Sequence, residues 1–479
     1  MEVKIGPFSV KDEKEVLRLL SEFELPTEDL TINKLQDFSF IKKGRAIMFK
    51  GKQMFKFRNI SIVAAILTLS TNVSALEFHT VGYKSVGMGG AAIANSSGST
   101  AAYNNPAMLA FAKHDVELFL GVGMSVHDGG MVASMSELDD LGFTDAIDRM
   151  EDGVGSIQPA DRQILLDAKP IVLGMDNQSA QVAPQAALGI QIGSFGIGLF
   201  AVGEAAAVGV IDQTHTEYIF HDGTNYYDIN GNPSTEAAYN DTSMIYAIEN
   251  GDTYSAMYGI AIAEIPLAYS HAFDTEFGKV AVGGAVKFMQ GTTFFGKFAL
   301  DSDEEFSDVM DNSDKKTSQV GIDLGLAYKP NFSDDLTLAL AGKNLNSPEF
   351  DYVDNPLVST YKVEPMVRFG VAYDIFDSLE IAMDYDLTAN ETMMPDVDAQ
   401  YLGGGLNFHP FTWLSLRGGA MQNMDSSDDA GLIYTAGVGL GIKWIQIDLS
   451  AQMATNEITV NGEDYPRYAK VNIAIVSKW

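Results

Sequence analysis

The chain contains no cysteine among its 479 residues. Structural disulfides, a CxxC redox motif and cysteine-ligated zinc are therefore excluded. Basic residues are also scarce: residues 1–75 hold 12 Lys and Arg, which leaves 19 against 55 Asp and Glu in residues 76–479. Neutralising a phosphate backbone requires many cationic side chains, so this balance disfavours nucleic acid as a partner.

Long apolar runs are missing as well. The only uninterrupted apolar stretch near the start is residues 60–69, and a transmembrane helix needs about 20 residues. Lys56 and Arg58 precede this stretch, and the small residues Val73, Ser74 and Ala75 follow it. This order is typical of a secretory signal peptide, predicted over residues 48–75 with cleavage after Ala75. The alternative is a buried core helix.

Residues 1–47 precede the predicted signal peptide and need a separate explanation. The stretch VKIGPFSVKDEKEVLRLLSEFELPTEDL, with an amphipathic helix expected over residues 13–23, resembles the first strand and helix of GNAT-family acetyltransferases. The loop with which that family binds acetyl-coenzyme A has no counterpart before the signal peptide. We therefore interpret residues 1–47 as a truncated GNAT-like fragment or an overcalled N-terminus, and we expect no cofactor.

From residue 115 onward, apolar residues alternate with small or polar ones. Val320, Ile322 and Leu324 fall on one side of a strand, while Gly321 and Asp323 fall on the other. A soluble β-sandwich also alternates in this way. Many of these stretches, however, reach about 10 residues, the length of a membrane-crossing strand, whereas strands of soluble sheets average about 5–6.

The alternation predicts an all-β fold: a transmembrane antiparallel β-barrel of about 14 strands over residues 114–479, with short turns at one end and long outer loops at the other. Helical periodicity over residues 137–167 predicts a helical cap or a lumen insert. The expected strands are 114–127, 181–192, 195–211, 254–273, 278–300, 317–329, 335–344, 364–376, 378–391, 399–409, 412–423, 431–443, 445–453 and 468–479.

Aromatic residues close several of these strands. Tyr328, Tyr373 and Trp444 end apolar faces, as in the aromatic girdles of membrane barrels. The chain ends on an alternating strand with Trp479, which looks like the signal read by the barrel-assembly machinery. We therefore expect the protein in the bacterial outer membrane, with lipid, lipopolysaccharide and that machinery as partners.

The segment that follows the signal peptide is rich in glycine. Residues 81–92 read VGYKSVGMGGAA, and residues 99–109 read STAAYNNPAML. These stretches look like the hatch of FadL-type outer-membrane transporters, so residues 76–113 are expected to form a plug inside the barrel. The resemblance implies a ligand path past its Asn-Pro-Ala turn, at Asn104, Asn105, Pro106 and Ala107.

A second resemblance covers roughly residues 80–479. The stretches GKNLNSPEFD (342–351), EPMVRFGVAYDIFDSLEIAMDYDLTANE (364–391) and WLSLRGGAMQNM (413–424) are similar to barrel proteins named conjugal transfer protein TraF. That name is shared with a periplasmic thioredoxin-like protein of F-type conjugation. A chain without cysteine does not fit the redox protein, so the label by itself implies little mechanism.

Charged residues on the non-apolar strand face are predicted to face the lumen: Asp323, Arg368, Asp384, Asp386 and Arg417. The acidic stretches 301–305 and 425–429 lack the spacing of an EF-hand, so no metal site is predicted. None of the seven histidines lies beside a candidate nucleophile on a predicted lumenal face. We predict no catalytic residues and no enzymatic activity.

The sequence leaves two functions open for the barrel, besides an acetyltransferase hypothesis that rests on residues 1–47 alone. The first is a FadL-like passive channel or binding protein for small apolar molecules, in which the hatch plugs the lumen. The alternative is a non-transporting structural or surface barrel, accessory to conjugation or adhesion. An apolar path or a lateral gap between strands would favour transport, and a filled lumen would favour the structural role.

Overall fold

The computed structural model describes residues 3–5, 8–10, 80–96, 98–152, 158–298, 314–353, 360–425, 430–442 and 444–479. The chain divides into two compact units, Met1–Ala64 and Ala65–Trp479. In the first unit, β1 (Val3–Ile5) and β2 (Phe8–Val10) form an antiparallel hairpin. The predicted helix 13–23 and the predicted signal peptide lie outside the described residues.

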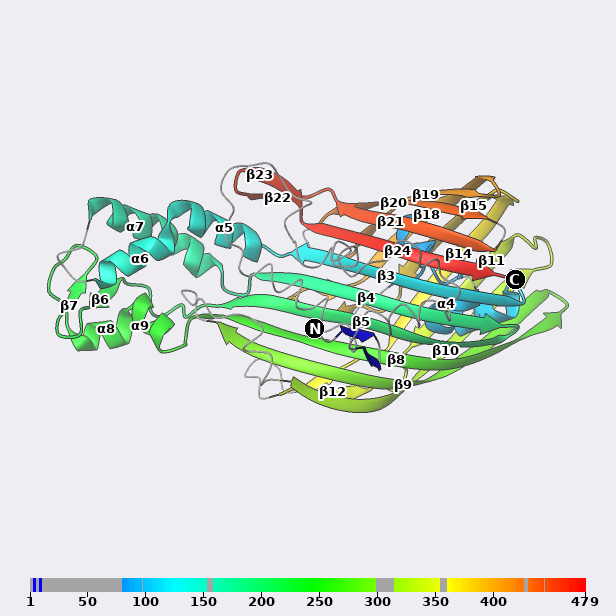
Figure 1. Ribbon diagram of the computed structural model, residues 1–479, viewed down its shortest axis with the longest axis horizontal. Coiled ribbons are helices and arrows are strands. Elements are labelled where there is room, and N and C mark those ends of the chain that lie inside the picture. Colours follow the sequence, from blue (N-terminus) through cyan, green and yellow to red (C-terminus); the bar gives the residue numbers. More distant parts are fainter. Residues whose placement is uncertain are drawn as a thin grey trace. The chain divides into compact units, whose positions relative to one another are not determined.

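The second unit contains a closed barrel of 14 antiparallel strands, in which the last strand pairs with the first (Figure 1). The fold class predicted from the alternation is therefore confirmed. The strands are β3 (Val116–Asp128), β4 (Ser179–Ile192), β5 (Phe195–Val210), β8 (Tyr254–Thr275), β9 (Gly278–Phe298), β10 (Asp314–Pro330), β11 (Leu336–Lys343), β14 (Met366–Phe376), β15 (Leu379–Asp386), β18 (Tyr401–Phe411), β19 (Leu414–Asn423), β20 (Leu432–Ile442), β21 (Ile445–Ala454) and β24 (Tyr468–Lys478).

The wall of the barrel is uneven in height. Strands β8 and β9 have 22 and 21 residues, whereas β11 and β15 have eight each. β15 ends at Asp386, five residues before its predicted end. Its partner β14 begins just after Pro365, which has no backbone N–H to extend the ladder.

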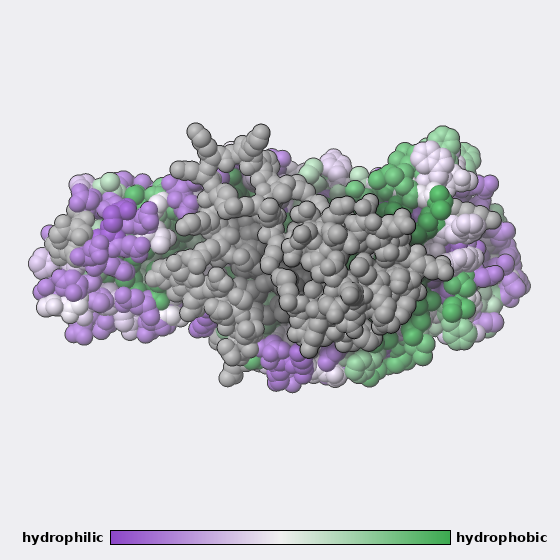
Figure 2. All heavy atoms as spheres, in the orientation of Figure 1, coloured by the Kyte–Doolittle hydropathy of each residue, from purple (hydrophilic) through white to green (hydrophobic). Residues whose placement is uncertain are grey.

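The outer face of the barrel is apolar. Leu267, Val286 and Leu324 each expose about half or more of their surface, and Figure 2 shows hydrophobic residues gathered over the wall. At the end with the short turns, which we call the short-turn end, exposed aromatic residues form a belt: Phe195, Phe277, Phe332, Phe376, Phe411, Trp413, Trp444 and Trp479. An apolar band bordered by aromatic residues is typical of a membrane barrel. Within the described part of the chain, no helix has the length and apolar character needed to cross a membrane.

The long connections after β3 and β5 build a helical cap at the opposite, or cap, end of the barrel (Figure 1). We use "cap" for the described residues of 129–178 and 211–253. Its elements are α5 (Met131–Leu141), α6 (Phe143–Glu151), α7 (Pro159–Gly174), β6 (Ile219–His221), β7 (Tyr226–Asp228), α8 (Glu236–Thr242) and α9 (Met244–Glu249). The cap has an apolar core of its own, and Figure 2 shows a largely hydrophilic surface over it.

Three smaller hairpins lie in other long connections. They are β12 (Glu349–Asp351) with β13 (Thr360–Lys362), β16 (Asn390–Glu391) with β17 (Asp398–Ala399), and β22 (Glu457–Val460) with β23 (Glu463–Pro466). The last of these contacts α5 of the cap, where the backbone N–H of Asn461 donates to the Ser136 hydroxyl.

Candidate functional site

The described residues of 80–113, which we call the hatch, lie inside the barrel. They contain the short helices η2 (Ser85–Met88), α4 (Gly98–Asn104) and η3 (Pro106–Phe111). Asn105 starts η3, because its side-chain oxygen accepts a hydrogen bond from the Ala107 N–H at 3.1 Å, and Pro106 at the first helical position needs no partner. The turn predicted at Asn-Pro-Ala is thus the start of a helix.

Glycine on both sides lets the hatch backbone approach the wall. Gly89, with a left-handed φ of +66°, lies so close to β18 and β19 that an added Cβ would be 2.4 Å from the carbonyl oxygens of Gly404 and Ala420. On the wall, a Cβ at Gly403 would lie 2.0 Å from the carbonyl oxygen of Gly89. A real Cβ tolerates neither distance, so this contact requires glycine.

Polar wall side chains also hold the hatch backbone. Asp384 on β15 accepts hydrogen bonds from the N–H groups of Ala92 and Ile93, at 2.6 and 2.9 Å. The Thr435 hydroxyl accepts from the Gly89 N–H at 2.9 Å, and the Gln452 amide donates to the Val86 carbonyl at 2.9 Å. These contacts satisfy backbone groups of an irregular segment that is shielded from water.

The four residues predicted for the ligand path are all buried in the hatch. The Asn104 amide donates to the Val81 carbonyl at 2.8 Å, and the Asn105 amide donates to the Ile93 carbonyl at 3.0 Å. Pro106 and Ala107 lie against β9, where a Cβ at Gly283 would be 2.4 Å from the Pro106 carbonyl carbon. These contacts hold the hatch together, and a role in guiding a ligand stays a prediction.

The five charged residues predicted for the lumen are all buried. Arg368 pairs with Asp386 on the neighbouring strand, while Arg417 pairs with Asp448 and donates to the Tyr83 carbonyl. The remaining two have other partners, although Asp384 also lies close to the Arg368–Asp386 pair. Asp384 binds the hatch, and Asp323 lies on β10, 3.0 Å from the Lys287 ammonium.

Sequence reasoning missed the partners of these charges. Lys287 on β9 is fully buried and pairs with both Asp323 and Glu264. Its ammonium lies 2.8 Å from the Glu264 carboxylate on β8. Lys343 on β11 lies with its ammonium 3.1 Å from the centre of the Tyr103 ring in α4. A signal was present, since Glu264 and Lys287 each alternate with apolar residues along their strands. Their pairing depends on the register between strands, which the alternation does not define.

Above the hatch, toward the cap end, the lumen is mostly apolar, although the buried Glu204 of β5 also faces it. Inward-facing Tyr258, Met289 and Phe295 pack in one cluster with residues of the long connections. Phe350 of the β12–β13 hairpin is fully buried and lies on Gly291 of β9, so that hairpin folds inward over the lumen. The Tyr258 hydroxyl donates to the Met393 carbonyl at 3.0 Å, which fixes the connection after β15 in the same cluster.

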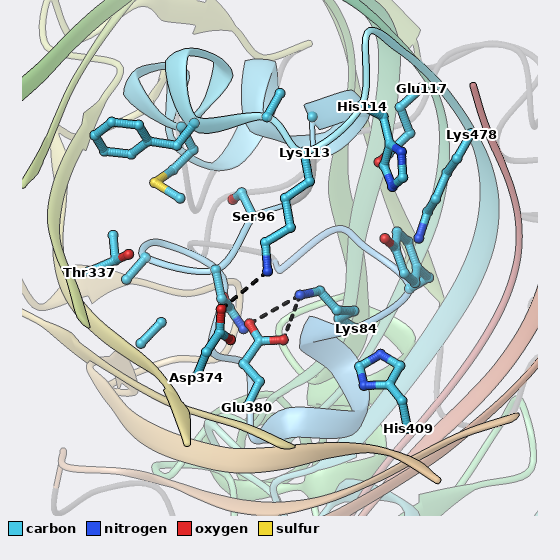
Figure 3. A pocket seen from close by; sticks show the side chains of 18 of the residues that line it. Lys84, Ser96, Lys113, His114, Glu117, Thr337, Asp374, Glu380, His409 and Lys478 are labelled. Carbon is cyan, nitrogen blue, oxygen red and sulfur yellow. Dashed lines mark hydrogen bonds and ion pairs between the residues drawn. The ribbon is translucent and has the colours of Figure 1, made fainter. Parts of the chain in front are cut away.

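A cavity of about 190 Å³ opens between the hatch and the wall at the short-turn end, and we call it the mouth cavity. Figure 3 shows Lys84 from the hatch and Glu380 from β15 meeting across it, with a nitrogen–oxygen distance of 2.8 Å. Lys113, which joins the hatch to β3, reaches Asp374 of β14 at 3.2 Å. Two ion pairs therefore tie the hatch to the wall at this end.

No group of three His, Asp or Glu side chains in the described residues is arranged to hold a metal ion. The mouth cavity contains two histidines, His114 and His409. His409 lies with its Nε2 3.2 Å from the Asn407 amide nitrogen.

The family described as "F plasmid transfer operon, TraF, protein" matches residues 102–386. No curated protein matches the chain.

Among solved structures, a TodX deltaS2 mutant monoaromatic hydrocarbon channel is 13% identical, with a TM-score of 0.47 over 85% of this chain and 99% of that one. The Ralstonia pickettii toluene transporter TbuX is 13% identical, with a TM-score of 0.46 over 84% of this chain and 100% of the transporter. A Pseudomonas aeruginosa FadL homologue is 12% identical, with a TM-score of 0.41 over 85% of this chain and 100% of the homologue. At these identities the likeness concerns the fold alone.

Proposed function

We propose that this chain, which belongs to the family described as "F plasmid transfer operon, TraF, protein", is an outer-membrane channel for small apolar molecules, closed by its hatch. The observation that carries this proposal is the apolar lumen above the hatch. A water-filled pore presents polar side chains to its lumen. Tyr258, Met289, Phe295 and Phe350 instead offer aromatic and thioether surface.

The wall contains a place where it could open sideways. The strands β4 and β5 are unpaired over a short stretch that lies between the pairs Val182–Ala205 and Gln185–Val202. The strands β5 and β8 are likewise unpaired between the pairs Ile197–Leu267 and Phe200–Glu264. Pro184 on β4 and Pro266 on β8 lie in these interruptions, and proline cannot donate to a ladder. Both sides of β5 are therefore weakened, which supports a lateral route between lumen and lipid.

The second candidate is the non-transporting structural barrel, and the filled lumen favours it. The hatch fills the lumen toward the short-turn end, and the cluster around Phe350 fills it toward the cap end. A barrel with a purely structural role, however, has no need of a separate plug that its wall holds by side-chain hydrogen bonds. For this reason we prefer a closed channel.

Deletion of residues 81–92 tests the two candidates. The deletion removes the hatch turn bound by Asp384 but no barrel strand, so the barrel should still show heat-modifiable mobility in electrophoresis. Uptake of an apolar dye such as N-phenylnaphthylamine by cells, and conductance in planar bilayers, should both rise several-fold. Unchanged uptake and conductance in a folded variant would favour the structural barrel.

A further inference from the structure

Cationic side chains concentrate at one place in an acidic chain. Residues 76–479 contain 19 Lys and Arg, and five of these line the mouth cavity: Lys84, Lys113, Lys329, Arg417 and Lys478. Only four of the 55 Asp and Glu do so: Glu117, Asp335, Asp374 and Glu380. The lining of the cavity is therefore richer in cations than the chain around it, although Arg417 also pairs with Asp448.

Most of the carboxylates at the cavity already have partners. Glu380 pairs with Lys84 and Asp374 with Lys113, while Glu117 accepts hydrogen bonds from the Ser99 hydroxyl and backbone N–H. Glu117 and Asp335 therefore form no ion pair with a cation in the described residues, although Ser99 holds Glu117 by hydrogen bonds. Two of the four carboxylates that line the cavity are neutralised by lysines of the hatch.

Two of the cations keep hydrogen-bonding capacity. Arg417 is almost completely buried, and its Nη2 has no partner among the described residues, although its other nitrogens contact Asp448, Asn407 and the Tyr83 carbonyl. The Lys478 ammonium lies 4.9 Å from the centre of the Tyr83 ring and is hydrogen-bonded to the Tyr83 side chain, but it forms no ion pair with a described carboxylate. A buried guanidinium nitrogen without a partner is costly unless something binds it.

We propose that the mouth cavity binds a small oxyanion, a phosphate or a short carboxylate, through Arg417 and Lys478. Oxygen anions suit these donors, because charge-assisted hydrogen bonds to guanidinium and ammonium groups are the strong ones. A cavity of about 190 Å³ has room for such an ion with water. The anion lies between Tyr83 and Lys84 of the hatch and two wall strands, β19 and β24, and therefore reinforces the closed position of the hatch.

This proposal does not rest on the channel function, because anion binding is expected whether or not the barrel conducts. Isothermal titration calorimetry on the purified full-length protein in detergent, at constant ionic strength, tests it. Sodium phosphate and sodium acetate are the two probes, with sodium chloride as the reference. Saturable heat with phosphate, with acetate or with both supports the site, and the comparison between them identifies the preferred oxyanion.

Variants make the test specific. Lys478→Gln removes the unpaired cation and should weaken binding about tenfold. Arg417→Lys keeps a charge beside Asp448 but removes Nη2, and should also weaken it. Lys113→Gln is the matched control, since it removes the same charge from the same cavity at a side chain that is 76% exposed and already paired. No saturable binding by the unmodified protein, or equal losses in Lys478→Gln and Lys113→Gln, would overturn the proposal.

Discussion

The hatch and the cap are both irregular additions to one barrel, but different forces hold them. The hatch lies against the wall, which supplies Asp384, Thr435 and Gln452 to its backbone and glycines to its turns. The cap buries its own apolar residues, including Leu165 and Val172 of α7. Contacts with the wall therefore determine the position of the hatch, whereas the cap is stabilised by its own apolar core.

The largest expected effect tests the independence of the cap. Leu165 on α7 is completely buried in the cap core, so Leu165→Ala should leave a cavity that costs about 2–5 kcal/mol. If the cap folds on its own core, limited proteolysis should cut within residues 129–178 much faster than in the unmodified protein. The heat-modifiable mobility of the barrel should be unchanged.

The neighbouring residue provides the control. Leu166 follows Leu165 on the same helix but is 48% exposed, so Leu166→Ala should change cleavage little. Loss of barrel mobility in Leu165→Ala would show that cap and barrel unfold together, and the contrast drawn between cap and hatch would then be wrong.

A smaller effect tests whether the wall positions the hatch. Gly403→Ala places a Cβ 2.0 Å from the Gly89 carbonyl oxygen, a backbone atom that cannot turn aside. Such overpacking typically costs about 1–3 kcal/mol, and displacing the hatch is the way to relieve it. We expect a lower midpoint of thermal unfolding and increased dye uptake.

Gly418 on the adjacent strand β19 is the matched position, because a Cβ there meets nothing within 4 Å. Gly418→Ala should therefore leave both the midpoint and uptake close to those of the unmodified protein. If Gly403→Ala and Gly418→Ala behave alike, close backbone approach does not position the hatch.

The strands of the barrel could be predicted closely from the sequence. β10 was expected over 317–329 and spans Asp314–Pro330, since apolar residues on its lipid face alternate with Gly321, Asp323 and Gly325 without a break. Lipid on one side and a filled lumen on the other impose this period on every strand. The same pattern explains why all five predicted lumenal residues are buried.

Short elements in the loops, and contacts between strands or with the hatch, could not be predicted from the residue pattern of a single strand. The helices α8 and α9 and the β6–β7 hairpin lie in the long loop expected between residues 211 and 254. The sequence does not predict them, because these elements span only three to seven residues and show no sustained period. The ion pair between Lys287 and Glu264 needs the register that aligns β8 with β9. The Lys84–Glu380 pair needs the path of the hatch through the lumen.

The smallest expected effect lies in the cap and tests whether its electrostatics act locally. His215 Nδ1 lies 2.6 Å from the Asp212 carboxylate, and Nε2 lies 3.0 Å from the Asn240 carbonyl. Burial lowers the pKa of His215, but the Asn240 carbonyl and the Asp212 carboxylate outweigh it, so the pKa is raised above 6.5. Burial likewise opposes the ionised form of Asp212, but hydrogen bonds from Thr214 and His215 hold its pKa at about 2.

This contact should stabilise the cap fully below pH 6.5 and weaken as the pH rises through the raised pKa of His215. Asp212 loses its charge only near pH 2, so it stays ionised over that range. NMR titration of histidine-labelled protein, with His215→Gln to assign the signal, should give a midpoint above 6.5, and protease cleavage near residue 215 should increase from pH 5.5 to 8. His215→Gln should abolish this pH dependence and leave dye uptake unchanged, because the hatch is held by the wall. A midpoint at or below 6.5 would contradict the assigned contact, and a change in uptake would couple the cap to the hatch.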